Sequence, residues 1–238
     1  GTLAVRANGE DFVREGFTTK DGWTVDFDHV YVSFADINAY QVEPAFDPAA
    51  AGEMPKPKVA IAIPGPTVVD LTAIKNGEKT VLVGDVTAPA GQYNALTWQM
   101  PPATTGPAQG YSLLIVGTAS KTGKTLPFSL GVQEPFGFAC GDFVGDERKG
   151  ILAAGGAADV EATFHFDHLF GDGEELADSE INFKALGFDP LAAMAQNNTV
   201  NLTSNDLKAV LTEAQYQSLL QILAGLGHTG EGHCRALT

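Results

Sequence analysis

Short apolar runs separated by glycine and proline dominate the first 170 residues of the sequence. The chain has 27 glycines and 13 prolines. Runs such as Val59–Ile63 and Leu113–Val116 have the length and the β-branched content of strands. Turn residues such as Pro64-Gly65-Pro66 lie between them. Because helical periodicity is nearly absent here, the sequence predicts a mainly β fold, an antiparallel β-sandwich of the transthyretin or immunoglobulin type.

Two segments alternate apolar and polar residues. In the first, Trp23, Val25 and Phe27 share a face, and the apolar phase then slips by one residue near Asp28-His29. Such a slip turns the side chains to the other face, so it predicts a β-bulge. The second segment, Ala158–Asp167, predicts a strand with one buried and one solvated face.

Helical signals appear only after Phe183. Asp189-Pro190 predicts the start of a short helix, and Thr212-Glu213-Ala214-Gln215 is a capping box for a longer one. We therefore predict a β-sandwich domain over residues 1–183. Residues 184–238 are predicted to be a helical C-terminal segment that packs on the sandwich and is not an independent domain.

The charge balance excludes several classes of partner. Lys and Arg number 14 and Asp and Glu number 29, which gives a net charge of −15. This acid excess argues against binding to nucleic acid and to anionic membrane surfaces. No apolar run approaches the 18 residues or so of a transmembrane helix, so we expect membrane attachment only through a lipid anchor that precedes this sequence. The missing initiator Met suggests that an export signal has been removed.

Two cysteines, Cys140 and Cys234, are present. In an exported protein such a pair is expected to form one disulfide. The alternative is two free thiols, in which case Cys234 is a candidate metal ligand beside His233.

Four of the five histidines occur in two pairs. The first pair lies in Phe164-His165-Phe166-Asp167-His168, and the second lies in the segment from Gly227 to Cys234. Neutral imidazole is the commonest metal ligand in proteins, and sets of histidine and carboxylate suit Zn²⁺ well. The sequence thus predicts a transition-metal site, with zinc as the expected ion. The candidate ligands are His165, His168, His228 and His233, with Asp167, Glu231 and Cys234 as alternates.

Two other functions compete with metal binding. The runner-up is a surface adhesion or assembly module without a metal, in which the histidines are ordinary polar residues. The third is metal-dependent hydrolysis, because His165, Asp167 and His168 resemble part of the metallo-β-lactamase motif His-x-His-x-Asp-His. Thr163 stands where that motif has its first histidine, and the motifs of serine hydrolases and nucleotide-binding proteins are missing. A binding protein is therefore favoured over an enzyme.

An acidic loop follows the first histidine pair. Its acids are Asp172, Glu174, Glu175, Asp178 and Glu180. Calcium takes several oxygen ligands from one loop, which makes this loop a candidate calcium site. The EF-hand spacing is absent, so a solvated acidic loop is the favoured interpretation.

The first part of the chain resembles a module of exported bacterial lipoproteins. The resemblance is carried by Val69-Asp70-Leu71, Asn76-Gly77, Val83-Gly84-Asp85 and Pro89-Ala90-Gly91-Gln92-Tyr93, and it extends over about residues 1–130. It implies a transthyretin-like β-sandwich in a secreted protein, located in the periplasm or on the cell surface. The function of such modules is largely unassigned, and the resemblance implies nothing about the histidines.

Overall fold

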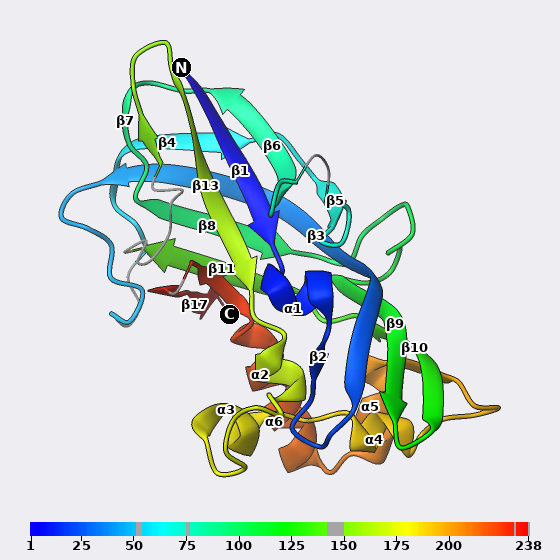
Figure 1. Ribbon diagram of the computed structural model, residues 1–238. Helices are drawn as coiled ribbons and strands as arrows, with labels where there is room; N and C mark the ends of the chain where they lie inside the picture. Colours follow the sequence, from blue (N-terminus) through cyan, green and yellow to red (C-terminus); the bar gives the residue numbers. More distant parts are fainter. Residues whose placement is uncertain (51–53, 75–76, 142–149, 231, 238) are drawn as a thin grey trace.

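The computed structural model describes residues 1–50, 54–74, 77–141, 150–230 and 232–237. Two large β-sheets form a sandwich-like arrangement, and most of the helices gather at one end of it (Figure 1). The predicted mainly β class is confirmed. The sheets are mixed, because each contains one parallel pair beside its antiparallel pairs. Within the described residues, no helix has both the length and the apolar character needed to cross a membrane.

The smaller sheet joins the two ends of the chain. Across it the strands are β16 (Gly232–His233), β15 (Gly227–Thr229), β13 (Ala157–Phe164), β1 (Thr2–Asn8) and β6 (Val81–Thr87). Strand β1 pairs in parallel with β13, which also pairs with β15. The C-terminal segment therefore contributes strands to the sandwich in addition to the predicted helices.

The larger sheet is organised around β3, which changes partners along its length. Its main strands are, in order, β14 (Val200–Thr203), β10 (Lys124–Val132), β9 (Leu113–Lys121), β3 (Thr24–Val42), β8 (Ala95–Met100), β11 (Phe136–Gly141) and β17 (Arg235–Leu237). Three more strands pair with β3, namely β2 (Phe17–Thr18), β4 (Pro57–Ile63) and β5 (Thr67–Asp70). A separate two-stranded ribbon contains β7 (Gly91–Gln92) and β12 (Ile151–Leu152). The register shift between Phe27 and His29 confirms the predicted bulge.

Aromatic side chains fill the space between the two sheets. Phe164 of β13 packs edge-on against Phe34 of β3, with ring centroids 5.9 Å apart. Trp98 of β8 stacks on Phe138 of β11 at 5.1 Å. All four rings are almost fully buried, and each such burial stabilises the fold by about 1.5–3 kcal/mol. This packing fixes the end of β13, and His165 follows directly.

The helices are short. They are α1 (Glu10–Glu15), α2 (Asp167–Phe170), α3 (Glu180–Lys184), α4 (Asp189–Ala192), α5 (Ser204–Val210) and α6 (Glu213–Ala224). The capping box of Thr212 and Gln215 opens α6 as predicted. The short helix at Asp189-Pro190 is also observed, and Phe188 is its N-cap. Buried residues of the helical end belong to the same apolar cluster as the sandwich.

The prediction of a solvated face on residues 158–167 is wrong. Glu161 and Thr163 are 6% and 0% exposed. The side-chain amide of Asn8 donates a hydrogen bond to Glu161 at 2.8 Å, and the backbone N–H of Gly230 donates one to Thr163 at 3.2 Å. Strand β1 and the β15–β16 hairpin thus supply polar partners that replace water on this face. The strand ends at Phe164, so Asp167 opens α2 instead of extending the strand.

Candidate metal centre

Four histidines meet where β13 ends beside the β15–β16 hairpin. His165 follows β13 and donates its backbone N–H to the carbonyl oxygen of Leu226 at 3.2 Å, and His168 lies one turn later in α2. His228 of β15 and His233 of β16 are register partners in the hairpin. The structure therefore brings both predicted pairs together.

A glycine lets the hairpin approach closely enough to deliver His228. A Cβ atom on Gly227 would lie 2.4 Å from the ring of Phe138, well inside van der Waals contact. Without a side chain at this position, β15 can lie against β11 and still pair with β13. His228, the next residue, is thereby held against the end of β13.

The imidazole rings are in mutual contact. The His165 and His228 rings stack with centroids 4.0 Å apart and planes at 21°. The His168 ring lies 5.1 Å from the His228 ring. One donor atom from each of these three residues lies within 4.8 Å of the other two. Tetrahedral donors at a Zn–N distance of about 2.0–2.1 Å are roughly 3.4 Å apart, so modest side-chain rotations bring the three nitrogens to a common ion.

Burial keeps the central imidazole neutral. His228 is only 2% exposed. Its pKa is lowered to about 2, chiefly by desolvation and then by repulsion from His165, His233 and His168, while the Gly225 carbonyl weakly opposes the shift. The pKa of His168 is also lowered, mainly by burial. A neutral imidazole offers its lone pair without competition from a proton, which is the state that a metal requires.

Among the described residues, neither ring nitrogen of His228 has a hydrogen bond of good geometry. Both atoms are buried, and the Gly225 carbonyl interacts only weakly with the ring. A buried polar group left unsatisfied costs about 1–3 kcal/mol, so proteins normally supply a partner for at least one of these atoms. A metal ion bound to one nitrogen would remove that cost.

His233 contacts the His228 ring, but its donor atoms do not converge with those of the other three histidines. Its ring centroid is 4.4 Å from that of His228 and 6.2 Å from that of His168. It is exposed, and it does not belong to the set of three converging donor atoms. The arrangement is thus a three-histidine set with a fourth histidine at its edge.

The cysteines form a disulfide beside this cluster. Cys140 of β11 is bonded to Cys234, and β17 continues from there as the edge strand paired with β11. The disulfide consumes both thiols, so the alternative of a Cys234 thiolate ligand is wrong. The bond instead anchors the strand that carries His233.

The carboxylate candidates are less central. Asp167 is buried, its Oδ1 has no hydrogen-bond partner among the described residues, and its charge acts to raise the pKa of His168. It is not part of the converging set of donors. Glu231 lies outside the described residues.

Sequence reasoning missed one carboxylate, that of Glu10. Its Oε1 lies 3.6 Å from Nε2 of His165. Glu10 opens α1 with a φ of +59°, and the side-chain oxygen of Asn8 accepts its backbone N–H at 2.8 Å. A carboxylate behind a ligating histidine orients the ring and raises its basicity. No local pattern signals this contact, because it depends on the parallel pairing of β1 with β13.

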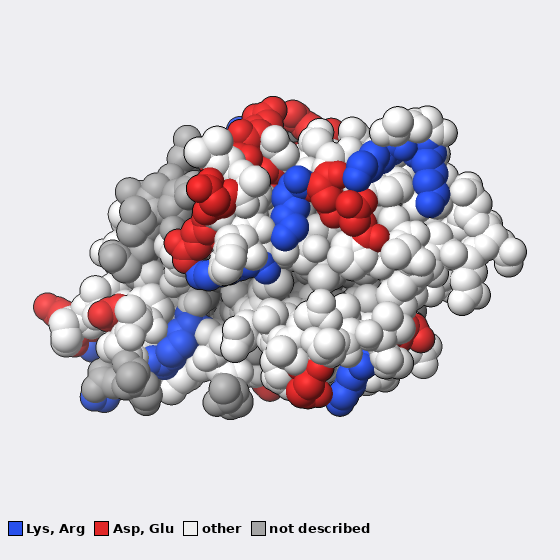
Figure 2. All heavy atoms as spheres, turned by 90° about the horizontal axis from the view of Figure 1, so that it is seen from below, with Lys and Arg blue, Asp and Glu red and all other residues white. Residues whose placement is uncertain are grey.

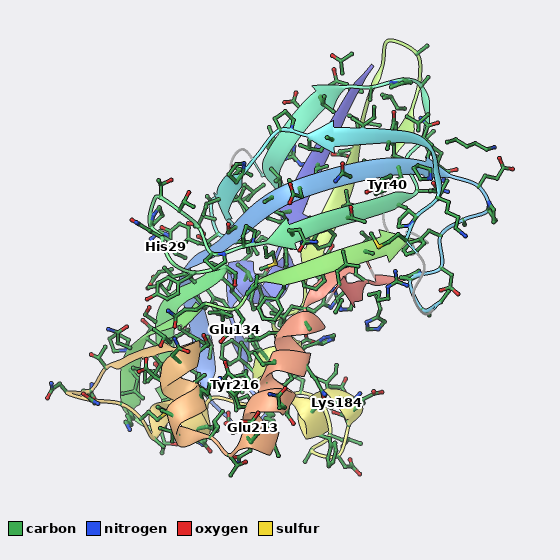
Figure 3. The ribbon with its side chains drawn as sticks, turned by 180° about the vertical axis from the view of Figure 1, so that it is seen from behind. His29, Tyr40, Glu134, Lys184, Glu213 and Tyr216 are labelled. Carbon is green, nitrogen blue, oxygen red and sulfur yellow. A yellow bond between two sulfur atoms is a disulfide. The ribbon has the colours of Figure 1, made fainter. Side chains whose placement is uncertain are left out.

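A pocket of about 780 Å³ adjoins the cluster. His168 and His233 form part of its wall, and the remaining wall comes mostly from α3 and α6. Figure 3 shows these two helices side by side, with Lys184 labelled on α3. His168 and His233 are therefore accessible through the pocket, whereas His228 is buried behind them.

The acidic loop that leads into α3 is organised by Asn182. The buried side-chain amide of Asn182 donates hydrogen bonds to the carbonyl oxygens of Asp172 at 2.8 Å and Leu176 at 3.0 Å, and its oxygen accepts the N–H of Asp172 at 2.8 Å. This holds α3 in place. Calcium binding by the loop stays a prediction.

Comparison with known proteins identifies one family. Residues 20–135 match a family model described as a domain of unknown function (DUF4382). No curated protein and no solved structure matches the chain significantly. The matched region ends before β11, so the four clustered histidines lie outside it.

Proposed function

Residues 20–135 form a DUF4382 domain, a family whose function is unknown, and we propose from the histidine cluster that this protein binds a transition-metal ion. The ligands are His165, His168 and His228. His233 lies close enough to be a fourth ligand after a side-chain rotation, but three ligands are the arrangement that the donor positions favour.

The observation that carries this proposal is the environment of His228. His228 is 2% exposed and faces two further imidazoles. Its only polar contact among the described residues is a weak one with the Gly225 carbonyl, and neither ring nitrogen has a hydrogen bond of good geometry to them. A histidine that serves only to fill a core normally donates or accepts at least one hydrogen bond. Three imidazoles in contact are also mutually repulsive when protonated, so the cluster is suited to neutral rings around a cation.

Zinc is the ion that suits these ligands best. Zn²⁺ has a filled d shell, so its d electrons impose no preferred geometry on the ligands. It binds three imidazole nitrogens readily and keeps a fourth position for water or another ligand. Copper(II) and iron(II) also bind imidazole. Measuring the affinity of the protein for each of these ions distinguishes them from zinc. Copper(I) favours thioether and thiolate sulfur, and the disulfide leaves no thiolate here.

We also propose that the protein is exported, as a periplasmic or cell-surface lipoprotein with a transthyretin-like sandwich. The Cys140–Cys234 disulfide supports export, because structural disulfides persist in oxidising compartments and are rare in the cytosol. The sandwich of mixed sheets is compatible with that fold type.

The test is a zinc titration of protein purified without a histidine tag. After incubation with zinc and gel filtration, elemental analysis should give one zinc per chain. The His228→Ala variant should fall below about a tenth of that value, because it removes the central ligand. The matched control is His29→Ala, which removes the one histidine outside the cluster, an exposed residue paired with Asp70. Equal zinc content in wild type and His228→Ala would reject these ligands.

A further inference from the structure

Helix α3 and the loop that leads into it present two large apolar side chains to water. Phe183 is 81% exposed and Leu176 is 75% exposed, more than any other large apolar side chain in the described residues. A single apolar side chain on a surface is ordinary, but two in one short segment indicate a contact site for another molecule. We call residues 172–184, which carry both side chains, the α3 segment.

The α3 segment is held in a fixed shape. Asn182 is buried, and its side-chain amide donates hydrogen bonds of 2.8–3.2 Å to three carbonyl oxygens of the loop. The ammonium group of Lys20 donates to the carbonyl oxygens of Asn182 and Ala185. A surface that is ordered before binding loses less conformational entropy when a partner docks, so both apolar side chains are presented ready for contact.

The charges around these side chains are mostly negative. The α3 segment has five acids and one base, so its charge is 1 − 5 = −4, and Lys20 beside it adds one positive charge. The pocket next to Asp172 and Glu174 adds three acids and two bases, namely Glu10, Asp11, Glu15, Arg14 and Lys79. A zinc ion in the histidine cluster would add two positive charges and Asp167 one negative charge, which leaves the excess negative.

Most acids of the α3 segment are available to a partner. Glu180 pairs with Lys184. No ion pair with a described residue is formed by the other four, which are Asp172, Glu174, Glu175 and Asp178. Figure 2 shows basic and acidic side chains interspersed on the helical end of the molecule, so the unpaired acids distinguish this segment from its surroundings. An apolar anchor within a rim of one charge sign fits a protein partner of the opposite charge.

We propose that the α3 segment docks a basic segment of another protein, in which a large apolar side chain lies among lysine or arginine residues. The apolar side chain contacts Phe183 and Leu176, and the cations pair with the surrounding carboxylates. This inference does not depend on the proposed metal site.

Two other occupants fit the charge less well. In a symmetric dimer the same patch of two copies would meet, so the acids of one copy would face the acids of the other. Membrane surfaces that carry anionic lipids would be repelled in the same way. A basic polypeptide is therefore the occupant that the charges favour.

The experiment measures the binding of a labelled oligolysine peptide with one central tryptophan to the metal-free protein, by fluorescence anisotropy at physiological ionic strength. The expected result is one peptide per chain. The same peptide with serine in place of tryptophan should bind at least about tenfold more weakly, because it lacks the apolar anchor. No binding of the tryptophan peptide, or equal binding of the two peptides, would overturn the inference.

An apolar variant tests where the peptide binds. Phe183→Ser/Leu176→Ser keeps every charge of the protein and changes only exposed positions, where folding is not at risk. It should weaken binding of the tryptophan peptide at least about tenfold. Unchanged affinity would show that the peptide binds elsewhere and would overturn the inference. Sedimentation and vesicle binding test the other occupants: a dimer, or binding to phosphatidylcholine vesicles, that this variant loses would also overturn it.

A charge variant tests the role of the acids. Glu175→Gln/Asp178→Asn removes two unpaired charges and should weaken binding several-fold. The matched control is Asp36→Asn/Asp85→Asn, which removes two charges at exposed positions of β3 and β6 and should leave the affinity unchanged. Equal effects of the two variants would mean that the peptide responds only to the net charge of the protein, and would overturn the inference.

Discussion

The rings of His165 and His228 stack with their centroids 4.0 Å apart, although one residue follows β13 and the other lies in the C-terminal hairpin. The contact depends on the antiparallel pairing of Thr163 with His228. The sandwich thus delivers two imidazoles from distant segments to one point, and α2 adds a third.

Replacing His233 separates a three-ligand site from a four-ligand site. His233 is exposed and lies outside the converging donors, so His233→Ala should still bind one zinc per chain. His168→Ala removes one of the three direct ligands. Loss of a residue that only contacts a ligand costs about 10–100-fold in metal affinity, so loss of the ligand itself should lower zinc affinity by at least about 100-fold. Competition with a chelating dye measures both affinities. Equal losses in the two variants would favour four ligands.

Glu10 is expected to orient His165. Glu10→Gln keeps the size of the side chain and removes the charge that faces the His165 ring at 3.6 Å. Outer-shell substitutions of this kind typically lower metal affinity by about 10–100-fold. The zinc stoichiometry should stay at one. Glu15→Gln, an exposed residue of the same helix, is the matched control and should leave the affinity unchanged.

The stability of the metal-free protein should fall as the solution becomes acidic. The pKa of His228 is about 2 in the folded protein and about 6.5 in an unfolded chain. Below pH 6.5 the unfolded state therefore binds the additional proton, and stability decreases as pH falls. Between pH 6.5 and 5.5 this one residue contributes a loss of about 1 kcal/mol.

Urea denaturation at the two pH values measures this effect. The His228→Gln variant cannot titrate at this position, so it is the control, and its stability should change by about 1 kcal/mol less than that of wild type. Identical changes in the two proteins would mean that His228 titrates normally.

The hydrogen bond from Tyr216 to Glu134 should stabilise the wall of the pocket. Tyr216 lies on α6, and its hydroxyl donates to Oε1 of Glu134 (Figure 3). Burial, together with this contact, raises the pKa of Tyr216 to about 12. Because Tyr216→Phe leaves a half-buried carboxylate without this donor, we expect a loss of about 1–3 kcal/mol in the free energy of unfolding.

Tyr40→Phe is the comparison for a hydrogen bond between two uncharged groups. It removes a hydroxyl–hydroxyl contact of 3.0 Å and should lower the free energy of unfolding by about 0.5–1.5 kcal/mol.

Removing the disulfide should affect stability more than zinc binding. The bond closes a loop of 94 residues, and the loss of such a bond typically costs about 2–5 kcal/mol. The three proposed ligands are positioned by β13, α2 and β15, so a Cys140→Ser/Cys234→Ser double variant that is still folded should bind one zinc. Thermal unfolding and zinc titration of the same sample measure both effects. A folded double variant without zinc would show that the bond also holds the ligands.

Local patterns in the sequence predicted the local parts of the structure. The phase slip at Asp28-His29 predicted the bulge, and the spacing of Thr212 and Gln215 predicted the start of α6. Both depend on interactions between residues that are close in the chain. The clustering of histidine in two short segments indicated where a site should be sought, and it needed only the residue types.

Contacts between distant segments could not be predicted in this way. The parallel pairing of β1 with β13 places Asn8 opposite Thr163 and so brings α1 beside the site. This pairing explains both the burial of Glu161 and the approach of Glu10 to His165. Alternation alone indicates that two faces differ, but it does not say whether water or polar side chains cover the polar face.

Anomalous diffraction from zinc-loaded crystals tests the central claim most directly. The account predicts one strong zinc peak at about 2.0–2.1 Å from one ring nitrogen of each of His165, His168 and His228, with the remaining position directed toward the pocket between α3 and α6. A zinc peak that lacks His228 as a ligand, or no peak at the cluster in crystals soaked at saturating zinc, would contradict it.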